Sequence, residues 1–246
     1  MLISRYLEKV APRSVWKYRI HSWHFETGEP EQVLVPELCD RQKMSVDIGA
    51  ADGAYTVRMF LYSASVLAFE ARPDAARNLT SLFHNTTDIN IRNLALSDSS
   101  GTVQLRIPED RPMLATIDTH NSLTDSPKLS SVSIACRRLD DYNLSKVGFV
   151  KIDVEGHEFP VLLGAQETIR RNRPNFLIEI EGRHNSESFN QIIKFFDSVD
   201  YEGFFYPQEL RPLSEFDPAK HQAHENLVDR GKRVGTYINN FIFRPR

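Results

Sequence analysis

Short apolar runs alternate with amphipathic stretches along most of the chain. The runs have the length of buried strands, and the amphipathic stretches repeat their apolar residues at helical spacing. The predicted strands are Ser45–Ile48, Val66–Glu70, Ile89–Leu96, Phe149–Val154 and Asn175–Ile180. The predicted helices are one that begins at Ala54, Pro73–His84, one from about Pro160 to Arg173, and Glu187–Ser198. This alternation predicts an α/β fold with an open, doubly wound, mostly parallel sheet that binds its ligand at the carboxyl ends of the strands.

Two further pairs of strands complete the pattern. They are Thr102–Ile107 with its partner Ser131–Ala135, and Tyr201–Tyr206 with Tyr237–Phe243. No helical stretch separates the last two strands, which predicts an antiparallel hairpin at one edge of the sheet.

The chain divides into an N-terminal extension, residues 1–44, and a main domain, residues 45–246. Two polar segments with several prolines interrupt the main domain at about residues 108–130 and 207–236. We expect the first to be a long surface loop, because it is polar and contains several prolines. Loops of this length inside a domain often carry function. The second is expected to pass over one edge of the sheet as a candidate substrate lid.

The N-terminal extension combines a helical pattern with a cluster of aromatic and basic residues. Its first apolar residues are spaced as in a helix: Leu2, Ile3, Tyr6, Leu7 and Val10. Aromatic and basic residues then interleave over Val15–Phe25. We expect these aromatic side chains to pack on the domain or to lie over the ligand mouth. The alternative is a surface for nucleic acid or lipid.

Composition narrows the class of protein. Hydrophobic residues make up 41% of the 246 residues and charged residues 26%, as in ordinary globular domains. The net charge of −3 provides no basic field for nucleic acid or an anionic membrane. The sequence has no apolar run of the roughly 20 residues that span a membrane, and its start lacks a signal-peptide core. Cys39 and Cys136 are far apart and form no zinc or redox motif, so we expect a reduced, cytoplasmic protein.

The turn after the first predicted strand has the features of a ligand-binding loop. Gly49 and Gly53 bracket it, and a helix begins directly afterwards. Backbone N–H groups and the positive end of a helix therefore meet at the carboxyl edge of the sheet. The dinucleotide fingerprint G-x-G-x-x-G is absent, because Ala51 and Ala54 occupy its second and third glycine positions. A nicotinamide-dependent oxidoreductase is therefore disfavoured.

Two carboxylates near this turn suggest which ligand it binds. Glu70 ends the next predicted strand, where an acidic residue suits the hydroxyl groups of a ribose. Asp47 adds negative charge beside the turn, which disfavours a pyrophosphate and favours a ligand with an ammonium or sulfonium group. S-adenosylmethionine has a ribose, both of these cations and no phosphate. An ordinary strand–turn–helix that ends in an acid is the simpler alternative.

A second charged cluster follows the most apolar strand. Asp153, Glu155, His157 and Glu158 lie within six residues, where open α/β sheets place their chemistry. Such groups perturb one another's protonation, and a histidine near neutrality suits a general base for a hydroxyl nucleophile. Alternatively, Glu158 caps the next helix while Glu155 and His157 face solvent.

Several motifs in this order resemble the FkbM family of S-adenosylmethionine-dependent methyltransferases. They are VDIGAADGAYT, AFEARPDAARNL, NLALSDSSGTVQL, RRLDDY, FVKIDVEGHEFPVLLGA and NFLIEIEGRH, with a looser match at NNFIF. The resemblance covers about residues 45–185 and departs at Asp52, where many relatives carry asparagine. It implies a Rossmann-like class I methyltransferase fold and, typically, O-methylation of a sugar or polyketide hydroxyl.

The resemblance also implies roles for individual residues. The expected cofactor site comprises Asp47, Gly49, Ala50 and Gly53 at the methionine end, Glu70 at the ribose, Asn93, Ala95 and Leu96 along the adenine, and Asp153 near the methyl group. The candidate general bases are His157 first, then Asp153, Glu158 and His184. A weaker hypothesis gives a divalent cation the carboxylates of Asp153, Glu155 and Glu179.

Two hypotheses for function follow. In the first, the protein is an O-methyltransferase for a small-molecule or glycan hydroxyl. In the second, it is a non-catalytic module with a methyltransferase-like fold that binds a partner through its aromatic N-terminus. The presence of Asp47, Gly49, Gly53 and Glu70 together favours the enzyme.

Overall fold

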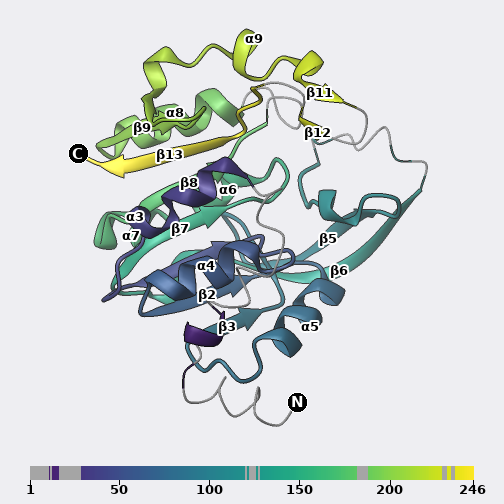
Figure 1. Ribbon diagram of the computed structural model, residues 1–246. Coiled ribbons are helices and arrows are strands. Elements are labelled where there is room, and N and C mark those ends of the chain that lie inside the picture. The colour runs from purple at the N-terminus through teal and green to yellow at the C-terminus, as the bar shows by residue number, and fades with distance from the viewer. Residues whose placement is uncertain are drawn as a thin grey trace.

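The computed structural model describes most of the chain (Figure 1). The described residues are 11, 13–16, 29–119, 121, 126, 128–181, 188–228, 232–233 and 236–246. The helical pattern predicted for residues 2–10, most of the aromatic segment, and the candidate base His184 lie outside them.

A large twisted sheet forms the centre of the fold. In the described part of the chain its order is β10-β9-β13-β8-β7-β1-β2-β3. The strands are β1 Met44–Ile48, β2 Ser65–Phe69, β3 Ile89–Arg92, β7 Val147–Ile152, β8 Asn175–Glu179, β9 Tyr201–Phe205, β10 Arg211–Pro212 and β13 Asn240–Pro245. Neighbouring strands from β3 to β8 are parallel, and β13 is antiparallel to both β8 and β9. The predicted antiparallel pairing is confirmed, but β13 lies between β8 and β9 and β10 forms the edge.

Helices cover both faces of this sheet, as predicted for a doubly wound fold. The helices α3 (Val35–Leu38), α4 (Ala54–Tyr62) and α5 (Pro73–Leu82) bury their apolar residues in one core with Phe149 and Leu177 of the sheet. The helices α6 (Glu158–Leu163), α7 (Gln166–Asn172) and α8 (Ser188–Ser198) pack on the other face, whose core includes Val150 and Ile178. Alternation of side chains along each strand separates the two cores.

Trp16 belongs to the predicted aromatic segment and packs on the domain. It is 2% exposed, and its ring lies 5.0 Å from that of Phe83. Its indole Nε1 donates a hydrogen bond to Thr86 Oγ1 at 3.1 Å. For this residue the predicted packing is confirmed.

The single strand predicted over Ile89–Leu96 is wrong, because the chain changes sheets within it. β3 ends at Arg92, and Ala95–Leu96 forms β4, which pairs with β6 in a second sheet. The side chain of Asn93 donates hydrogen bonds to the carbonyl oxygens of Glu70 and Ala71 at 2.9 and 3.1 Å. These contacts hold the chain where it leaves the first sheet. The helix predicted from about Pro160 to Arg173 is likewise divided, into α6 and α7.

The second sheet has the order β4-β6-β5 and extends from the side of the molecule (Figure 1). β5 (Gly101–Pro108) and β6 (Leu129–Arg137) form the predicted pair and run antiparallel. The segment between them contains a short 3-10 helix, η3 (Pro112–Leu114), and Thr116 pairs with Arg106 of β5. This segment therefore folds back along β5.

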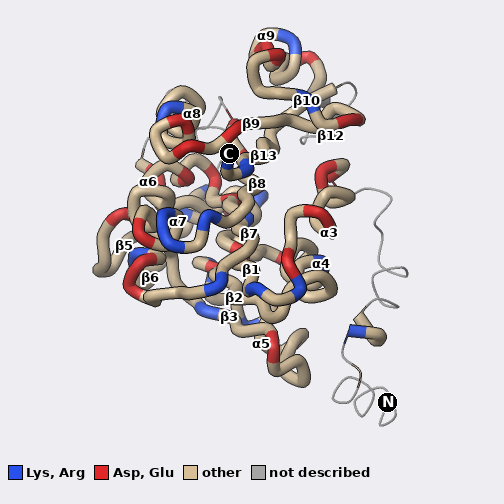
Figure 2. The backbone as a smooth tube through the Cα atoms, turned by 90° about the vertical axis from the view of Figure 1, so that its left-hand side faces the viewer, with Lys and Arg blue, Asp and Glu red and all other residues tan. Residues whose placement is uncertain are grey.

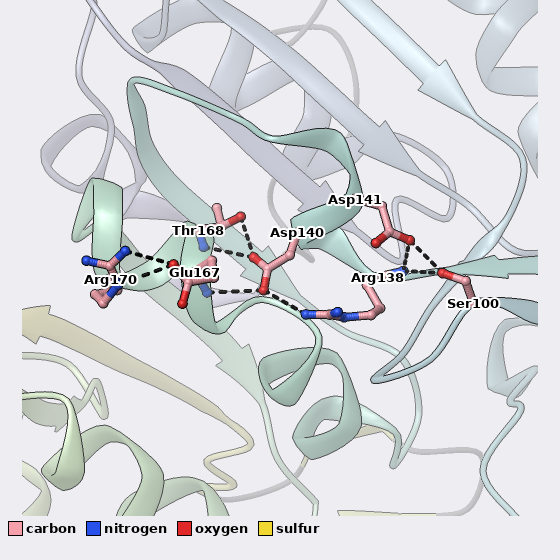
Figure 3. Close-up of polar contacts among 7 residues, drawn as sticks. All are labelled: Ser100, Arg138, Asp140, Asp141, Glu167, Thr168 and Arg170. Atoms are coloured by element: carbon pink, nitrogen blue, oxygen red, sulfur yellow. Dashed lines mark hydrogen bonds and ion pairs between the residues drawn. The ribbon is translucent and has the colours of Figure 1, made fainter.

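Figure 3 shows the polar contacts that join the second sheet to α7 through the 3-10 helix η4 (Leu139–Tyr142). Asp140 Oδ1 accepts hydrogen bonds from the backbone N and the Oγ1 of Thr168, each at 2.8 Å, and its Oδ2 accepts one from Glu167 N at 3.1 Å. Asp140 thus satisfies N–H groups at the start of α7 that have no partner within the helix. Asp141 Oδ2 accepts a hydrogen bond from Ser100 Oγ at 2.5 Å, at the turn that leads into β5.

The segment 207–236 contains short elements at the β9 end of the sheet (Figure 1). After β10 they are η5 Leu213–Glu215, α9 Pro218–His221, η6 His224–Asn226, β11 Leu227–Val228 and β12 Lys232–Arg233. Basic and acidic residues are interspersed along the described chain, without a region of one sign (Figure 2).

No helix among the described residues is both long enough and apolar enough to span a bilayer.

Candidate active site

A cleft opens at the carboxyl ends of β1, β2 and β7. Its opposite wall is formed by β4 and by residues 113 and 115–117, which lie at and just after η3 and belong to what we call the η3 segment. Its empty space amounts to about 750 Å³, including the part open to solvent. Most of its lining is apolar; the polar side chains that line it are those of Glu70, Arg72, Thr116, Asp153, Glu155 and His157. An apolar cleft with a few polar groups at a sheet edge is the usual form of a small-molecule site.

Gly49 allows β1 to turn directly against β7. Its φ is +84°, and a Cβ added there would lie 1.7 Å from the carbonyl oxygen of Asp153. Gly49 and Ala50 both donate their N–H groups to Phe69 O, at 2.9 and 3.1 Å. Gly49 lines the cleft, whereas Ala50 is buried behind it. Gly53 faces Leu79, so it allows α4 to approach α5.

Glu70 is held rigidly at the base of the cleft. Its Oε2 accepts a hydrogen bond from Ala51 N and its Oε1 accepts one from Arg72 N, both at 2.7 Å. The side chain is 6% exposed. Burial raises the pKa of Glu70, and the two backbone N–H groups oppose that effect. Carboxylate oxygens with one donor each retain lone pairs for a ligand.

Asp47 lies behind the turn and does not line the cleft. It is fully buried, and its Oδ2 accepts a hydrogen bond from Thr56 Oγ1 at 2.5 Å. Burial raises the pKa of Asp47 to about 6. The structure therefore places Asp47 as a support beneath α4, not along the cleft wall where the resemblance led us to expect it.

The expected adenine residues are divided between the cleft and its support. Ala95 and Leu96 line the cleft together with Leu94. Asn93 does not line it, because its side chain holds the Glu70–Ala71 backbone. Asn93 therefore positions the backbone of Glu70 and does not contact the space in the cleft.

Glu158 stabilises the turn after β7. It is 2% exposed, and its Oε1 accepts hydrogen bonds from Gly156 N at 2.9 Å and Val154 N at 3.3 Å. These contacts hold a turn in which Glu155 and Gly156 both have positive φ, +55° and +100°. Glu158 does not line the cleft, and the N–H groups that it accepts from precede α6, so its side chain holds the turn and does not cap the helix as the alternative predicted.

Replacing Glu158 with glutamine is expected to change how stability depends on pH. Burial raises the pKa of Glu158 from 4.5 to about 7. The folded protein therefore holds an extra proton between these values, and its free energy of unfolding falls as pH rises through that window. Glu158→Gln keeps an acceptor oxygen but cannot ionise. The free energy of unfolding of the variant minus that of wild type should therefore be about 2–3 kcal/mol higher above pH 7.5 than at low pH.

Urea unfolding at several pH values between 4.5 and 8.5 measures this effect. Glu109→Gln, at an exposed position, is the matched control and should follow wild type at every pH. A constant difference between Glu158→Gln and wild type across the range would show that Glu158 does not titrate in this window.

His157 connects the walls of the cleft. Its Nε2 lies 2.8 Å from Ser97 Oγ, just after β4, and its Nδ1 lies 3.7 Å from Asp118 Oδ2, in the segment after η3. Burial lowers the pKa of His157 against the opposing effect of Asp118, which favours a neutral ring near pH 7. His157 lines the cleft, and its partner Ser97 is 60 positions away in the sequence, so the sequence pattern gave no sign of this contact.

The η3 segment is anchored to the cleft by residues that sequence reasoning missed. Arg106 donates hydrogen bonds to the carbonyl oxygens of Asp118 and Asn121. Asn121 Nδ2 donates to Glu155 O at 2.9 Å, on the turn after β7. The only signal in the sequence was the length of the polar segment 108–130. Within this segment, residues 113 and 115–117 line the cleft.

Asp153 lies between the cleft and a second polar cluster. Its Oδ2 is 3.3 Å from Nζ of Lys151, which is 1% exposed and lies 5.0 Å from the ring centroid of Tyr55. Burial disfavours the charge on Lys151, but neighbouring carboxylates, Asp153 above all, outweigh it and raise its pKa. Among the described residues, carboxylate oxygens of Glu29, Asp153 and Glu179 lie within 4.8 Å of one another. Burial, then repulsion from Asp153, raises the pKa of Glu179 well above its usual value.

This cluster differs from the predicted cation set. Glu29 joins Asp153 and Glu179, whereas Glu155 lines the cleft. Glu29 was missed because it precedes the domain pattern by many residues and reaches the site only through folding of the N-terminal segment.

The sheet order, the reversed strand β13 and a cleft at the carboxyl ends of β1, β2 and β7 define a class I methyltransferase fold. Residues 47–203, more than half of the chain, match the sequence profile of the methyltransferase FkbM domain, and the chain belongs to this family.

Solved methyltransferase structures are similar to this chain. The methyltransferase FkbM from Methylobacillus flagellatus is 17% identical with a TM-score of 0.52, and the match covers 83% of this chain and 44% of that one. The match thus covers less than half the length of that protein. An rRNA methylase from Streptococcus thermophilus is 13% identical (TM-score 0.49; 89% and 97% covered). Fibrillarin from Aeropyrum pernix, with bound S-adenosyl-L-methionine, is 11% identical (TM-score 0.42; 83% and 67% covered). At these identities the likeness concerns the fold.

No curated protein matches the sequence.

Proposed function

We propose that this protein transfers the methyl group of S-adenosylmethionine to a hydroxyl group of a sugar, a glycan or a secondary metabolite. The observation that carries the proposal is Glu70, a buried carboxylate fixed by two backbone N–H groups at the base of an apolar cleft. Such a group at the end of the second strand suits the two hydroxyls of a ribose. Membership of a methyltransferase family supports the same cofactor.

The residues of the cleft fit the parts of this cofactor. Glu70 would accept hydrogen bonds from the ribose hydroxyls, and Leu96 and Ile117 would contact the adenine. The Gly49–Ala51 turn would hold the methionine end, and Asp153 would face the sulfonium, whose positive charge suits a carboxylate. When bound, the cofactor supplies a methyl group already activated by its positive sulfur.

The protein must then align the acceptor and receive its proton. A C–O bond forms as the S–CH3 bond breaks, and the hydroxyl proton passes to a base. Asp153 is the candidate base that we favour, because it lines the cleft and adjoins the second polar cluster. His157 is less suited to this role because it is hydrogen-bonded to Ser97 and faces Asp118 at the opposite wall. Glu158 is less suited because it accepts hydrogen bonds from the backbone of its own turn.

Replacing Glu70 with alanine is expected to weaken binding of S-adenosylhomocysteine about 100-fold. Hydrogen bonds to a charged group contribute about 1.5–3 kcal/mol each, and the N–H groups of Ala51 and Arg72 would also lose their acceptor. Equilibrium dialysis of wild type and variant measures the ratio. Glu109→Ala, at an exposed position, should bind as wild type does. An affinity within threefold of wild type in Glu70→Ala would remove Glu70 from the cofactor site.

The reaction itself is tested with S-adenosylmethionine that carries a labelled methyl group and a panel of glycoside, sugar-nucleotide and phenolic acceptors. The proposal predicts label in a product that is stable to mild alkali, as a methyl ether is and a methyl ester is not. Label only in amines or esters would refute O-methylation. Cofactor binding with no transfer to any acceptor, together with specific capture of a protein, would favour the non-catalytic module.

A further inference from the structure

We propose that Glu29, Asp153 and Glu179, with the amide oxygen of Asn240, form a binding site for a hard divalent cation such as Mg²⁺ or Mn²⁺ beside the cleft. The three carboxylates come from distant parts of the chain: the segment before β1, the end of β7 and the end of β8. The fold thus gathers them at the edge of the sheet where the acceptor is expected.

The spacing of the carboxylates suits one ion. An oxygen from each lies within 4.8 Å of the other two. Oxygens on opposite sides of an ion with bonds of about 2.1–2.4 Å lie about 4.2–4.8 Å apart, so one ion can contact all three. Carboxylate and amide oxygens are the ligands that such cations prefer.

Asn240 provides a second, independent indication. It pairs directly with Glu179 across the antiparallel strands β13 and β8, so the two side chains lie on the same face of the sheet. Asn240 is fully buried, and among the described residues its Oδ1 has no hydrogen-bond donor. Its Nδ2 is directed to Asn239 Oδ1 at 3.4 Å. A buried carbonyl oxygen without a donor is costly unless a cation or donor occupies the space beside it.

The charge of the cluster also requires a partner. When all three are ionised, Glu29, Asp153 and Glu179 carry three negative charges, and Lys151 contributes one positive charge through its contact with Asp153, which leaves a net charge of −2. Glu29 instead accepts a hydrogen bond from Tyr55 Oη at 2.6 Å, and Glu179 accepts one from Asn239. One divalent cation would neutralise the cluster, and half-buried carboxylates at such separations repel one another without it.

The role of the cation, unlike the site itself, rests on the proposed function. A cation bound beside Asp153 would coordinate the acceptor hydroxyl, or two adjacent hydroxyls of a sugar. Coordination makes the hydroxyl proton more acidic and fixes the oxygen in position. The site would therefore favour acceptors that present neighbouring oxygens.

Mn²⁺ binding to the full chain tests the proposal without any turnover. After removal of metal with a chelator and dialysis, the electron paramagnetic resonance signal of free Mn²⁺ is followed during titration. We expect one site with a dissociation constant below about 1 mM, competed by Mg²⁺, and at least tenfold weaker in both Glu29→Gln and Glu179→Gln. Glu37→Gln, whose carboxylate is 70% exposed, should bind as wild type does.

Two outcomes would overturn the site: no binding by folded wild-type protein at about 5 mM Mn²⁺, or unchanged binding in both variants. Thermal unfolding checks that each variant is folded, and Glu29 lies outside the sheet, so its variant is the less disruptive. Binding of S-adenosylhomocysteine is measured in the same samples. If folded wild-type protein binds S-adenosylhomocysteine but not Mn²⁺, this inference alone is refuted and the proposed function stands.

Discussion

Asp153→Asn is expected to lower the turnover number by about 100- to 1,000-fold while the protein still binds S-adenosylhomocysteine. Asparagine has the shape of aspartate but cannot accept the proton of the acceptor hydroxyl, and general base catalysis contributes about 10²–10⁴-fold. S-adenosylhomocysteine has no sulfonium charge, so its affinity should change less than fivefold. The turnover number and the affinity for S-adenosylhomocysteine together distinguish loss of the chemical step from loss of the cofactor site.

His157→Asn is the matched control for this prediction. His157 holds Ser97 and faces Asp118 at the wall of the cleft, so its loss should act mainly on cofactor affinity. We expect its turnover number at saturating cofactor to fall less than tenfold. If Asp153→Asn kept more than a third of the wild-type turnover and His157→Asn lost most of it, the role of base would pass to His157.

Gly49→Ala is expected to destabilise the fold by more than about 3 kcal/mol and to abolish cofactor binding. The new Cβ would lie 1.7 Å from the Asp153 carbonyl oxygen and 2.8 Å from its carbon, and both atoms belong to the backbone. No side-chain rotation can relieve this clash. The φ of +84° adds strain for any residue with a Cβ. Separation of β1 from β7 would displace both Glu70 and Asp153.

Gly101→Ala is the control, because a Cβ at Gly101 meets no atom within 4 Å. Its stability should stay within about 1 kcal/mol of wild type, as is usual for an open surface position. Urea unfolding and S-adenosylhomocysteine titration of both variants measure the contrast. Equal stability of the two alanine variants would mean that the turn after β1 does not approach β7 as described.

The central part of the fold could be predicted because local patterns there agree with the tertiary structure. β1, β2, β7 and β8 are apolar runs buried on both faces, and the helices α4, α5 and α8 show clear helical spacing. The division of Ile89–Leu96 could not be predicted, since it depends on Asn93 contacting Glu70 and Ala71, more than 20 residues away. The break between α6 and α7 lies at Gly164, where a Cβ would lie 2.0 Å from Ser97 O, a long-range contact that the sequence pattern does not show.

The candidate site could be predicted in part for a related reason. Residues at strand ends, such as Gly49, Glu70 and Asp153, were found because parallel strands bring their carboxyl ends together. Asp47 and Glu158 occupy the same motifs but turn away from the cleft, and only the hydrogen bonds in the structure show this. Glu29 and Arg106 could not be found, because long-range folding alone brings them to the site.

The central claim is that the cleft binds S-adenosylmethionine, and calorimetric titration of the wild-type protein with S-adenosylhomocysteine tests it most directly. The account predicts one site with a micromolar dissociation constant and no detectable binding of NAD⁺. Absence of S-adenosylhomocysteine binding by folded protein, with and without added Mg²⁺, would contradict the account.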